Sequence, residues 1–206
     1  MMTDDRITNR FSYDEIARLV TPGSHVLDLG CGSGDLLDLL RRTRGVSGRG
    51  VDIQEEMIRA CLEKGISVFQ GDLDEGLKEY RSQSYDYVIL NETLQMIHDP
   101  VHLMNEMLRV GQRVIVNFPN FGYVVNRLQL ALLGRMPVNR TLPYEWYDTP
   151  NIHFCTRRDF VKLCDTIGAT IESAVDLRRN RRVAGVFANF AATDCCFVLR
   201  KPVPPG

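Results

Sequence analysis

One short stretch of the sequence could bring a ligand against the backbone. It reads Asp28-Leu29-Gly30-Cys31-Gly32-Ser33-Gly34 and follows an apolar run at residues 25–29 that suits a buried strand. Glycines between a strand and a helix allow a tight turn and a close approach of a bound molecule. The dinucleotide fingerprint GxGxxG needs glycine at position 35, but Asp35 stands there, and an acid at a helix start opposes a pyrophosphate. The loop therefore argues against NAD and favours a ligand with a ribose and no phosphate.

Three further polar residues recur at the ends of predicted strands. Asp52, Asp72 and Asn91 follow Asp28 at spacings of 24, 20 and 19 residues, one in each strand–helix unit. Open α/β sheets bind ligands at the carboxyl ends of their strands, where a carboxylate can accept ribose hydroxyls or an adenine amino group. Taken alone, the glycine triplet could be a simple turn and each aspartate a helix cap. The ordered set favours a ligand-binding edge, with Asp52 on the ribose and Asp72 on the adenine.

These residues need strands that alternate with helices to position them. Short apolar runs predict seven strands, and the last two have no helix pattern between them. The predicted strands cover residues 25–29, 48–53, 67–70, 85–91, 113–118, 169–177 and 195–201. The expected fold is α/β, with a doubly wound, mostly parallel, Rossmann-like seven-stranded sheet and an antiparallel hairpin at one edge.

Three predicted helices begin at capping residues. Ser12-Tyr-Asp-Glu15 has the pattern of a capping box before an apolar helix. Asp99 precedes Pro100, which suits the first position of a helix, and Thr156 precedes another helical pattern. These signals set where the connecting helices are expected to begin.

A single domain is expected over residues 1–206, because that length is close to the usual size of one domain. Residues 119–155 fit none of the strand–helix units. The segment is long and rich in proline and aromatic residues, which is typical of a lid or a binding surface. We therefore expect it to be an insertion that covers a site.

The composition argues against several other classes of protein. The net charge is −1, which disfavours a basic protein that coats nucleic acid. None of the six cysteines lies in a CxxC motif, and reduced thiols are typical of a cytoplasmic protein. No apolar stretch is long enough to cross a bilayer. Residues 1–120 are net acidic and residues 121–206 net basic, either by chance or because the second part faces an anionic substrate or an acidic partner.

Histidines and arginines give weaker signals. His98 and His102 are four residues apart, but a helix that begins at Pro100 leaves His98 outside it, so no metal site is expected. His153 could be a general base over a pocket or a hydrogen-bonded packing residue. The four arginines within residues 178–182 are expected in a solvated loop between the last two strands, with phosphate or acidic-partner binding as the alternative.

The glycine loop, Asp52, the segment Gly71–Leu73 and the strand Tyr85–Asn91 together resemble the class I S-adenosylmethionine-dependent methyltransferases. A narrower resemblance comes from the second half of the chain. The segments LRVG, FPNFG, GRMP and LPYEWYDTPNIH are similar to those of the methionine-biosynthesis MetW family, over roughly residues 10–200. The glycine loop is shared by a vast superfamily, whereas the LPYEWYDTPNIH block at 142–153 is far more specific.

The resemblance implies a cofactor, S-adenosylmethionine or S-adenosylhomocysteine, at four strand ends. The loop glycines would approach its methionine part, with Asp28 organising the loop. The residues at 52–53 would hold the ribose, those at 72–73 the adenine, and the backbone carbonyl of Asn91 the amino group. The implied cofactor-binding residues are Asp28, Gly30, Cys31, Gly32, Gly34, Asp52, Ile53, Asp72, Leu73 and Asn91.

Two functions stay open at this point. By resemblance, the chain would act in methionine biosynthesis with a homoserine O-acyltransferase, as an accessory or regulatory subunit that binds the cofactor. Alternatively, it would be an active methyltransferase on a small molecule. The sequence shows no compelling general base, but methyl transfer depends largely on positioning, so this decides little. The predicted fourth strand ends in Asn91-Glu92-Thr93-Leu94 with no NPPY-like motif, so methylation of nucleic-acid bases is unsupported.

Overall fold

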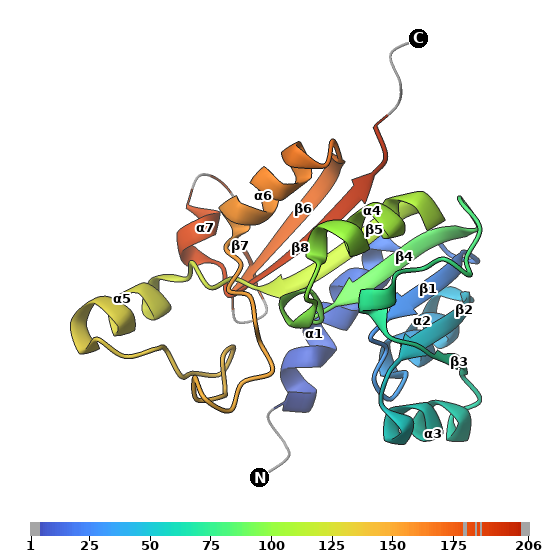
Figure 1. Cartoon of the computed structure of the whole chain (residues 1–206), viewed down its shortest axis with the longest axis horizontal. Coiled ribbons are helices and arrows are strands. Elements are labelled where there is room, and N and C mark those ends of the chain that lie inside the picture. Colours follow the sequence, from blue (N-terminus) through green and yellow to red (C-terminus); the bar gives the residue numbers. More distant parts are fainter. Residues whose placement is uncertain (1–4, 179–180, 184, 186, 203–206) are drawn as a thin grey trace.

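The computed structural model describes residues 5–178, 181–183, 185 and 187–202, and only the backbone of residues 5–11. The described residues form one eight-stranded sheet with the strand order β3-β2-β1-β4-β5-β8-β6-β7 (Figure 1). The strands are β1 (His25–Leu29), β2 (Ser47–Asp52), β3 (Ser67–Gln70), β4 (Tyr85–Asn91), β5 (Gly111–Pro119), β6 (Thr170–Arg178), β7 (Arg181–Val183) and β8 (Asp194–Arg200). The predicted α/β class and mostly parallel sheet are confirmed.

The antiparallel end of the sheet agrees with the prediction except in its strand count. The first five strands are parallel, and β8 pairs antiparallel with both β5 and β6. The predicted antiparallel edge is therefore confirmed, with β8 between β5 and β6 and with β7 outermost. The predicted count of seven strands is wrong, since Arg181–Val183 pairs with β6 as an eighth strand where a loop was expected. Of the four arginines, Arg179 lies outside the described residues.

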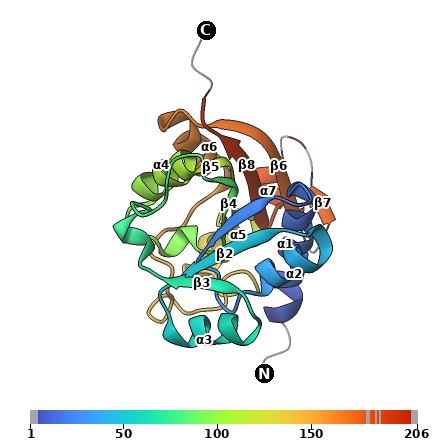
Figure 2. The same cartoon turned by 90° about the vertical axis from the view of Figure 1, so that its right-hand side faces the viewer.

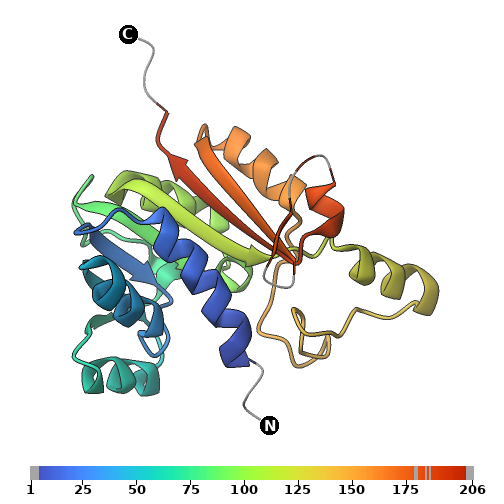
Figure 3. The same ribbon diagram turned by 180° about the vertical axis from the view of Figure 1, so that it is seen from behind.

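Helices cover both faces of the sheet. α4 (Pro100–Val110) and α6 (Arg157–Thr166) lie on one face, and α1 (Asp5–Leu19) and α2 (Asp35–Arg44) lie on the other (Figures 1 and 3). Figure 2 looks toward the β3 edge and shows both layers. The remaining helices are α3 (Glu55–Glu63), α5 (Val124–Leu133), α7 (Ala188–Ala191) and the 3-10 turns η1 (Leu73–Glu75) and η2 (Leu94–Met96).

Alternation along the strands produces two hydrophobic cores. Successive strand residues point to opposite faces, so Leu27 and Leu29 pack in the core with α4 and α6. Val26 of β1 belongs to the other core, which contains Ile16 of α1 and Leu36 and Leu37 of α2. These two layers hold the strands in register, which fixes where each carboxyl end lies.

The capping signals were partly correct. Asp99 accepts a hydrogen bond from the His102 N–H, and Thr156 forms a capping box with Asp159. The predicted capping box at Ser12 is wrong, because α1 begins earlier and Ser12 lies inside it. Glu15 instead accepts hydrogen bonds from Arg182 of β7, which ties α1 to the antiparallel end of the sheet.

The segment 119–155 begins at Pro119, the last residue of β5. It contains α5, which projects from the body of the molecule in Figure 1, followed by an irregular chain that returns to α6. Its return is held at η2, where the N–H groups of Ile152 and His153 both donate to the Gln95 carbonyl. Within the described ranges, no helix is long and apolar enough to cross a membrane.

Candidate functional site

The glycine loop and the carboxyl ends of β1 to β4 form one continuous region, which we call the cofactor edge. The four strands are adjacent in the sheet, in the order β3-β2-β1-β4. Residue pairing brings Leu29 beside both Val51 and Leu90, and Asp52 beside Gln70. The strand-end residues predicted from spacing therefore share one edge.

The glycine loop is fixed by the strands on both sides. The N–H groups of Gly30 and Cys31 donate to the Val51 carbonyl at the end of β2, at 2.8 and 3.0 Å. Gly30 has a φ of 66°, and a Cβ there would lie 2.5 Å from the Thr93 hydroxyl. Only glycine satisfies both constraints without strain.

Two cysteine side chains meet at the glycine loop, Cys31 from the loop itself and Cys61 from α3. The Cys61 thiol of α3 donates to the Gly32 carbonyl at 3.2 Å, and its sulfur lies 3.9 Å from that of Cys31. Both cysteines are buried. Burial, and then the charge of Asp28, raise the pKa of the Cys31 thiol. The two residues are protonated packing groups, which gives Cys31 a structural place in the loop.

Asp52 holds the loop directly. One carboxylate oxygen accepts the Gly32 N–H at 2.8 Å and the other accepts the Gln54 N–H at 2.9 Å. Each oxygen retains a free lone pair for a ligand hydroxyl. A Cβ built on Gly32 would meet nothing within 4 Å. The space beside Gly32 is thus open, and a ligand can reach the backbone there while Asp52 lies next to it.

Asp28 occupies an apolar position beneath the loop. It is 2% exposed, and burial, followed by the charge of Asp52, raises its pKa to about 8. Its carboxyl group is therefore largely protonated at pH 7. Tyr13 of α1 shares this environment, because burial and then the charges of Asp28 and Glu92 raise the pKa of its hydroxyl. A cation placed here would favour the ionised form of Asp28.

The residues after β2 and β3 differ in exposure. Ile53 is 58% exposed and follows Asp52, so it offers an apolar side chain beside the predicted ribose position. Asp72 is exposed and accepts the Asp74 N–H at 2.9 Å as the cap of η1. Leu73 is buried in the core with α4, so its side chain faces away from solvent. Asp72 has the capping role that a strand-end aspartate commonly takes, and its contact with adenine stays a prediction.

Asn91 ends β4 beside a strained residue. Its side-chain oxygen accepts from the Asn117 amide at 2.9 Å, and its backbone carbonyl accepts from the Thr93 hydroxyl at 3.0 Å. The next residue, Glu92, has a φ of 55°, which is rare for a residue with a side chain. Such strain concentrates at binding sites. The Asn91 carbonyl keeps a second lone pair for a ligand amino group.

A cavity of about 270 Å³ adjoins this end of β4. It lies between the cofactor edge and the segment 119–155, and a buried amide forms part of its wall. Gln95 is 8% exposed and its side-chain oxygen has no hydrogen-bond partner among the described residues. The cavity is lined by Glu92, Gln95, Met96, Pro119, Arg140, Thr141, Pro143, Tyr144, Pro150, Asn151 and Asp194. A polar small molecule could bind there, next to the residues that follow Asn91.

The remaining candidates lie elsewhere. The His98 ring bonds Asp74 at 2.7 Å, and His102 lies against Gly76. Among the described residues, no group of three or more His, Cys, Asp or Glu side chains could hold a metal ion. His153 is exposed, and its backbone N–H donates to Gln95.

Sequence reasoning missed the residues that reach the edge from distant parts of the chain. Tyr13 comes from α1, Cys61 from α3 and Thr93 from the turn before η2. No local pattern marks any of them, because each is identified only by contacts across the sheet. Cys61 contacts the loop at Gly32, and Thr93 lies against Gly30. Tyr13 lies near Asp28, and burial, followed by the charge of that aspartate, raises the pKa of the Tyr13 hydroxyl.

Solved structures of similar fold define the class of protein. A chain in the complex of the Haloferax volcanii Trm112 methyltransferase activator with a methyltransferase matches with a TM-score of 0.71 and 18% identity, covering 97% of this chain and 94% of that one. The Synechocystis magnesium protoporphyrin IX methyltransferase with bound S-adenosylhomocysteine matches with a TM-score of 0.65 and 18% identity, covering 97% and 86%. The chain thus has the fold of the class I S-adenosylmethionine-dependent methyltransferases.

Sequence comparison identifies the family within that class. Residues 10–199 match the family described as methionine biosynthesis protein MetW, and the chain belongs to it. The bifunctional methionine biosynthesis protein MetXA/MetW of Rhodopirellula baltica is 36% identical over 188 residues, which are 86% of this chain and 30% of that protein. The ubiquinone biosynthesis O-methyltransferase of Hahella chejuensis is 34% identical over 141 residues, covering 63% and 58%. The chain spans less than two thirds of the length of either relative.

Proposed function

We propose that the chain binds S-adenosylmethionine or S-adenosylhomocysteine at the cofactor edge and acts with a homoserine O-acyltransferase in methionine biosynthesis. Membership of the MetW family and the existence of a fused MetXA/MetW relative support this proposal. The observation that carries the cofactor part is the open space at Gly32 beside the Asp52 carboxylate. S-adenosylmethionine reports the supply of methionine, so its binding would let this chain adjust the acylation of homoserine.

The residues present fit such a cofactor. The open backbone at Gly32 can receive the methionine part, Asp52 has lone pairs for the ribose, and the exposed Ile53 can cover an adenine. Asp28 can ionise beside a sulfonium. When bound, S-adenosylmethionine supplies an electrophilic methyl group and S-adenosylhomocysteine does not, so the two ligands differ by one charge at this edge.

The test measures homoserine acylation by the acyltransferase of the same organism. The rate is measured with and without this chain, each with and without S-adenosylmethionine. A rate that depends on the chain supports the accessory role, and a further shift with the cofactor supports sensing. Four equal rates would refute the role with the acyltransferase.

A second candidate function, methyl transfer to a small molecule, is supported by a different observation. The cavity beside Glu92 and Gln95 lies where a methyl acceptor could approach a bound cofactor, and ubiquinone and menaquinone methyltransferases are among the relatives. An active methyltransferase on a small polar molecule would use this cavity for its acceptor. Incubation with radiolabelled S-adenosylmethionine and a metabolite extract tests it, and a cofactor-binding protein that labels nothing would exclude it.

A further inference from the structure

Exposed apolar side chains concentrate on the segment 121–154. More than half of the large hydrophobic residues that are exposed in the described chain lie there. Three leucines of α5 are the clearest, since Leu128, Leu132 and Leu133 are 51%, 77% and 67% exposed. An apolar concentration of this kind on a folded protein marks a surface that another molecule covers.

The helix α5 has no packing partner within the described chain. Asn126 is its only buried residue, and no described element packs along it. Its base is held by hydrogen bonds, in which Asn126 donates to the Phe121 carbonyl and Arg127 to the Gly122 carbonyl. Seven of the ten residues of α5 are apolar, and a helix of this composition normally packs against another surface. In Figure 1, α5 projects from the rest of the molecule, which leaves its apolar side chains available to another protein.

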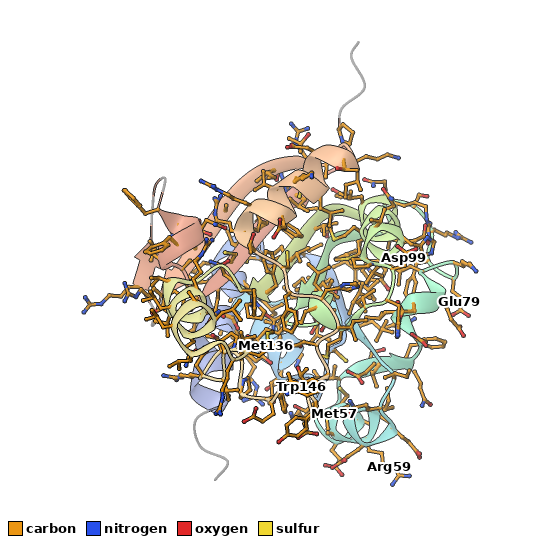
Figure 4. All side chains as sticks on the ribbon, turned by 60° about the vertical axis from the view of Figure 1, so that its left-hand side comes forward. Met57, Arg59, Glu79, Asp99, Met136 and Trp146 are labelled. Atoms are coloured by element: carbon orange, nitrogen blue, oxygen red, sulfur yellow. The ribbon has the colours of Figure 1, made fainter. Side chains whose placement is uncertain are left out.

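A groove continues this surface toward the loop that follows. It has a volume of about 630 Å³ and lies between the end of α5, at Leu133, and the aromatic block, at Trp146. Trp146 is 69% exposed and Tyr147 is 72% exposed, with their rings edge to face at 5.7 Å. Figure 4 shows Met136 and Trp146 on this side of the molecule. Aromatic anchors beside a groove are typical of the residues that dominate protein–protein binding.

The charge around the surface points to the nature of the partner. Residues 121–158 contain five arginines and only two acidic residues, so this part of the chain is net basic even though Arg157 is paired with Asp176. A symmetric pair of two copies would bring two net-basic segments together, and like charges at an interface are costly. A partner with an apolar patch and an acidic rim fits better.

We propose that the α5 surface, made of Val125, Leu128, Leu132, Leu133, Trp146 and Tyr147, is the site where the homoserine O-acyltransferase docks. This inference rests on the proposed function and adds the place of contact. The cofactor edge and the α5 surface are joined through η2, because Gln95 lines the cavity at the edge and accepts hydrogen bonds from Ile152 and His153 of the same segment. Docking there would let the acyltransferase respond to what the edge binds.

Two variants test the surface against a matched control. Leu132→Glu and Trp146→Ala each alter a side chain that is more than two-thirds exposed, so both should fold. Leu62→Glu changes a leucine of α3 that is 60% exposed on another part of the molecule. We expect each test variant to raise the dissociation constant for the purified acyltransferase about thirtyfold, as substitution of a hot-spot residue does. The control should leave this constant unchanged. Affinity for S-adenosylhomocysteine checks that every variant is folded.

Each outcome has a distinct meaning. If the unmodified chain does not bind the acyltransferase, the proposed function fails and the docking site with it. If it binds and both variants bind equally well, only the docking site is overturned. Sedimentation of a dimer that the variants dissociate, or binding to phosphatidylglycerol vesicles that they abolish, would reassign the surface if acyltransferase affinity stays unchanged. Weaker binding at high salt would support the acidic rim of the partner.

Discussion

The cofactor edge and the α5 surface are opposites in how their contacts are satisfied. At the edge, the loop N–H groups of Gly30 and Gly32 already have partners on β2, and there is open space beside Gly32. On α5, apolar side chains are exposed, and its side-chain hydrogen bonds to the rest of the chain come from the polar residues Asn126, Arg127 and Gln129. The first region is held by internal hydrogen bonds around an open space, and the second exposes an apolar surface. Under the proposed function, the first region binds the cofactor and the second contacts the acyltransferase.

The largest expected effect is a loss of ligand affinity from a substitution at the cofactor edge that leaves the α5 surface unchanged. Gly30→Ala introduces a Cβ that would lie 2.5 Å from the Thr93 hydroxyl, at a φ of 66°. We expect a loss of affinity for S-adenosylhomocysteine on the order of 100-fold, with destabilisation of about 1–3 kcal/mol. Calorimetry and thermal unfolding measure these. The matched control is Gly134→Ala at the end of α5, where φ is 62° but a Cβ meets nothing within 4 Å. It should leave the affinity unchanged, and equal losses in both variants would contradict the prediction.

The next largest effect is a difference in ligand affinity between the Asp52→Ala and Asp72→Ala variants. Asp52→Ala removes the acceptor of the Gly32 and Gln54 N–H groups as well as the predicted ribose contact. A loss of about 1.5–3 kcal/mol corresponds to roughly ten- to hundredfold weaker binding of S-adenosylhomocysteine. Asp72→Ala, at an exposed turn cap, should have a smaller effect. Unchanged affinity in a folded Asp52 variant would show that this residue does not hold the ribose.

A smaller effect concerns charge beneath the loop. The pKa of Asp28 is raised to about 8, so its carboxyl group ionises as the pH rises from 7 to 9. The ionised form favours the cationic S-adenosylmethionine over neutral-sulfur S-adenosylhomocysteine, by about 1 kcal/mol or about fivefold. The ratio of the two affinities should therefore increase over this range. The Asp28→Asn variant should show a flat ratio, and a flat ratio in the unmodified chain would contradict the placement of the methionine part.

The smallest expected effect on the edge comes from loosening α5. Asn126→Ala removes the donor to the Phe121 carbonyl and the acceptor of the Asn139 amide, at 2.7 Å. We expect faster hydrogen exchange in α5 and residues 134–142, because buried hydrogen bonding that contributes about 1 kcal/mol is lost. Affinity for S-adenosylhomocysteine should stay within twofold. A large loss of affinity would mean that the two regions are not separate.

The sequence predicted the strands of the cofactor edge better than it predicted α5 and the antiparallel end of the sheet. The strands at 25–29, 67–70 and 85–91 have the predicted bounds, because a buried strand leaves a short apolar run between turns. Asn91 ends the last of these strands, and Asp52 ends β2, which was predicted one residue later along the chain, at 48–53. The contacts of Tyr13, Cys61 and Thr93 were not predictable, because each crosses between elements far apart in the chain.

The antiparallel end and α5 were harder for other reasons. Arg181–Val183 is a strand through pairing with β6, although its own residues suggest a polar loop. Ser12 and Glu15 match a capping box, but the helix continues through them. α5 combines Asn126, Arg127 and Gln129 with seven apolar residues, most of them exposed, so its sequence does not show which side faces solvent. In each case a partner outside the segment determines its structure.

The interior position of β8 has a consequence for how the chain is made. β8 comes last among the strands, yet it fills the gap between β5 and β6. Its residues Cys195, Phe197 and Leu199 are fully buried between the layers. A growing chain on the ribosome can pair β1 to β5 early, but β6 must wait beside an open gap until residue 200 has emerged. Translation that stops before residue 194 would remove this central strand, so such truncated products should be unfolded and readily degraded.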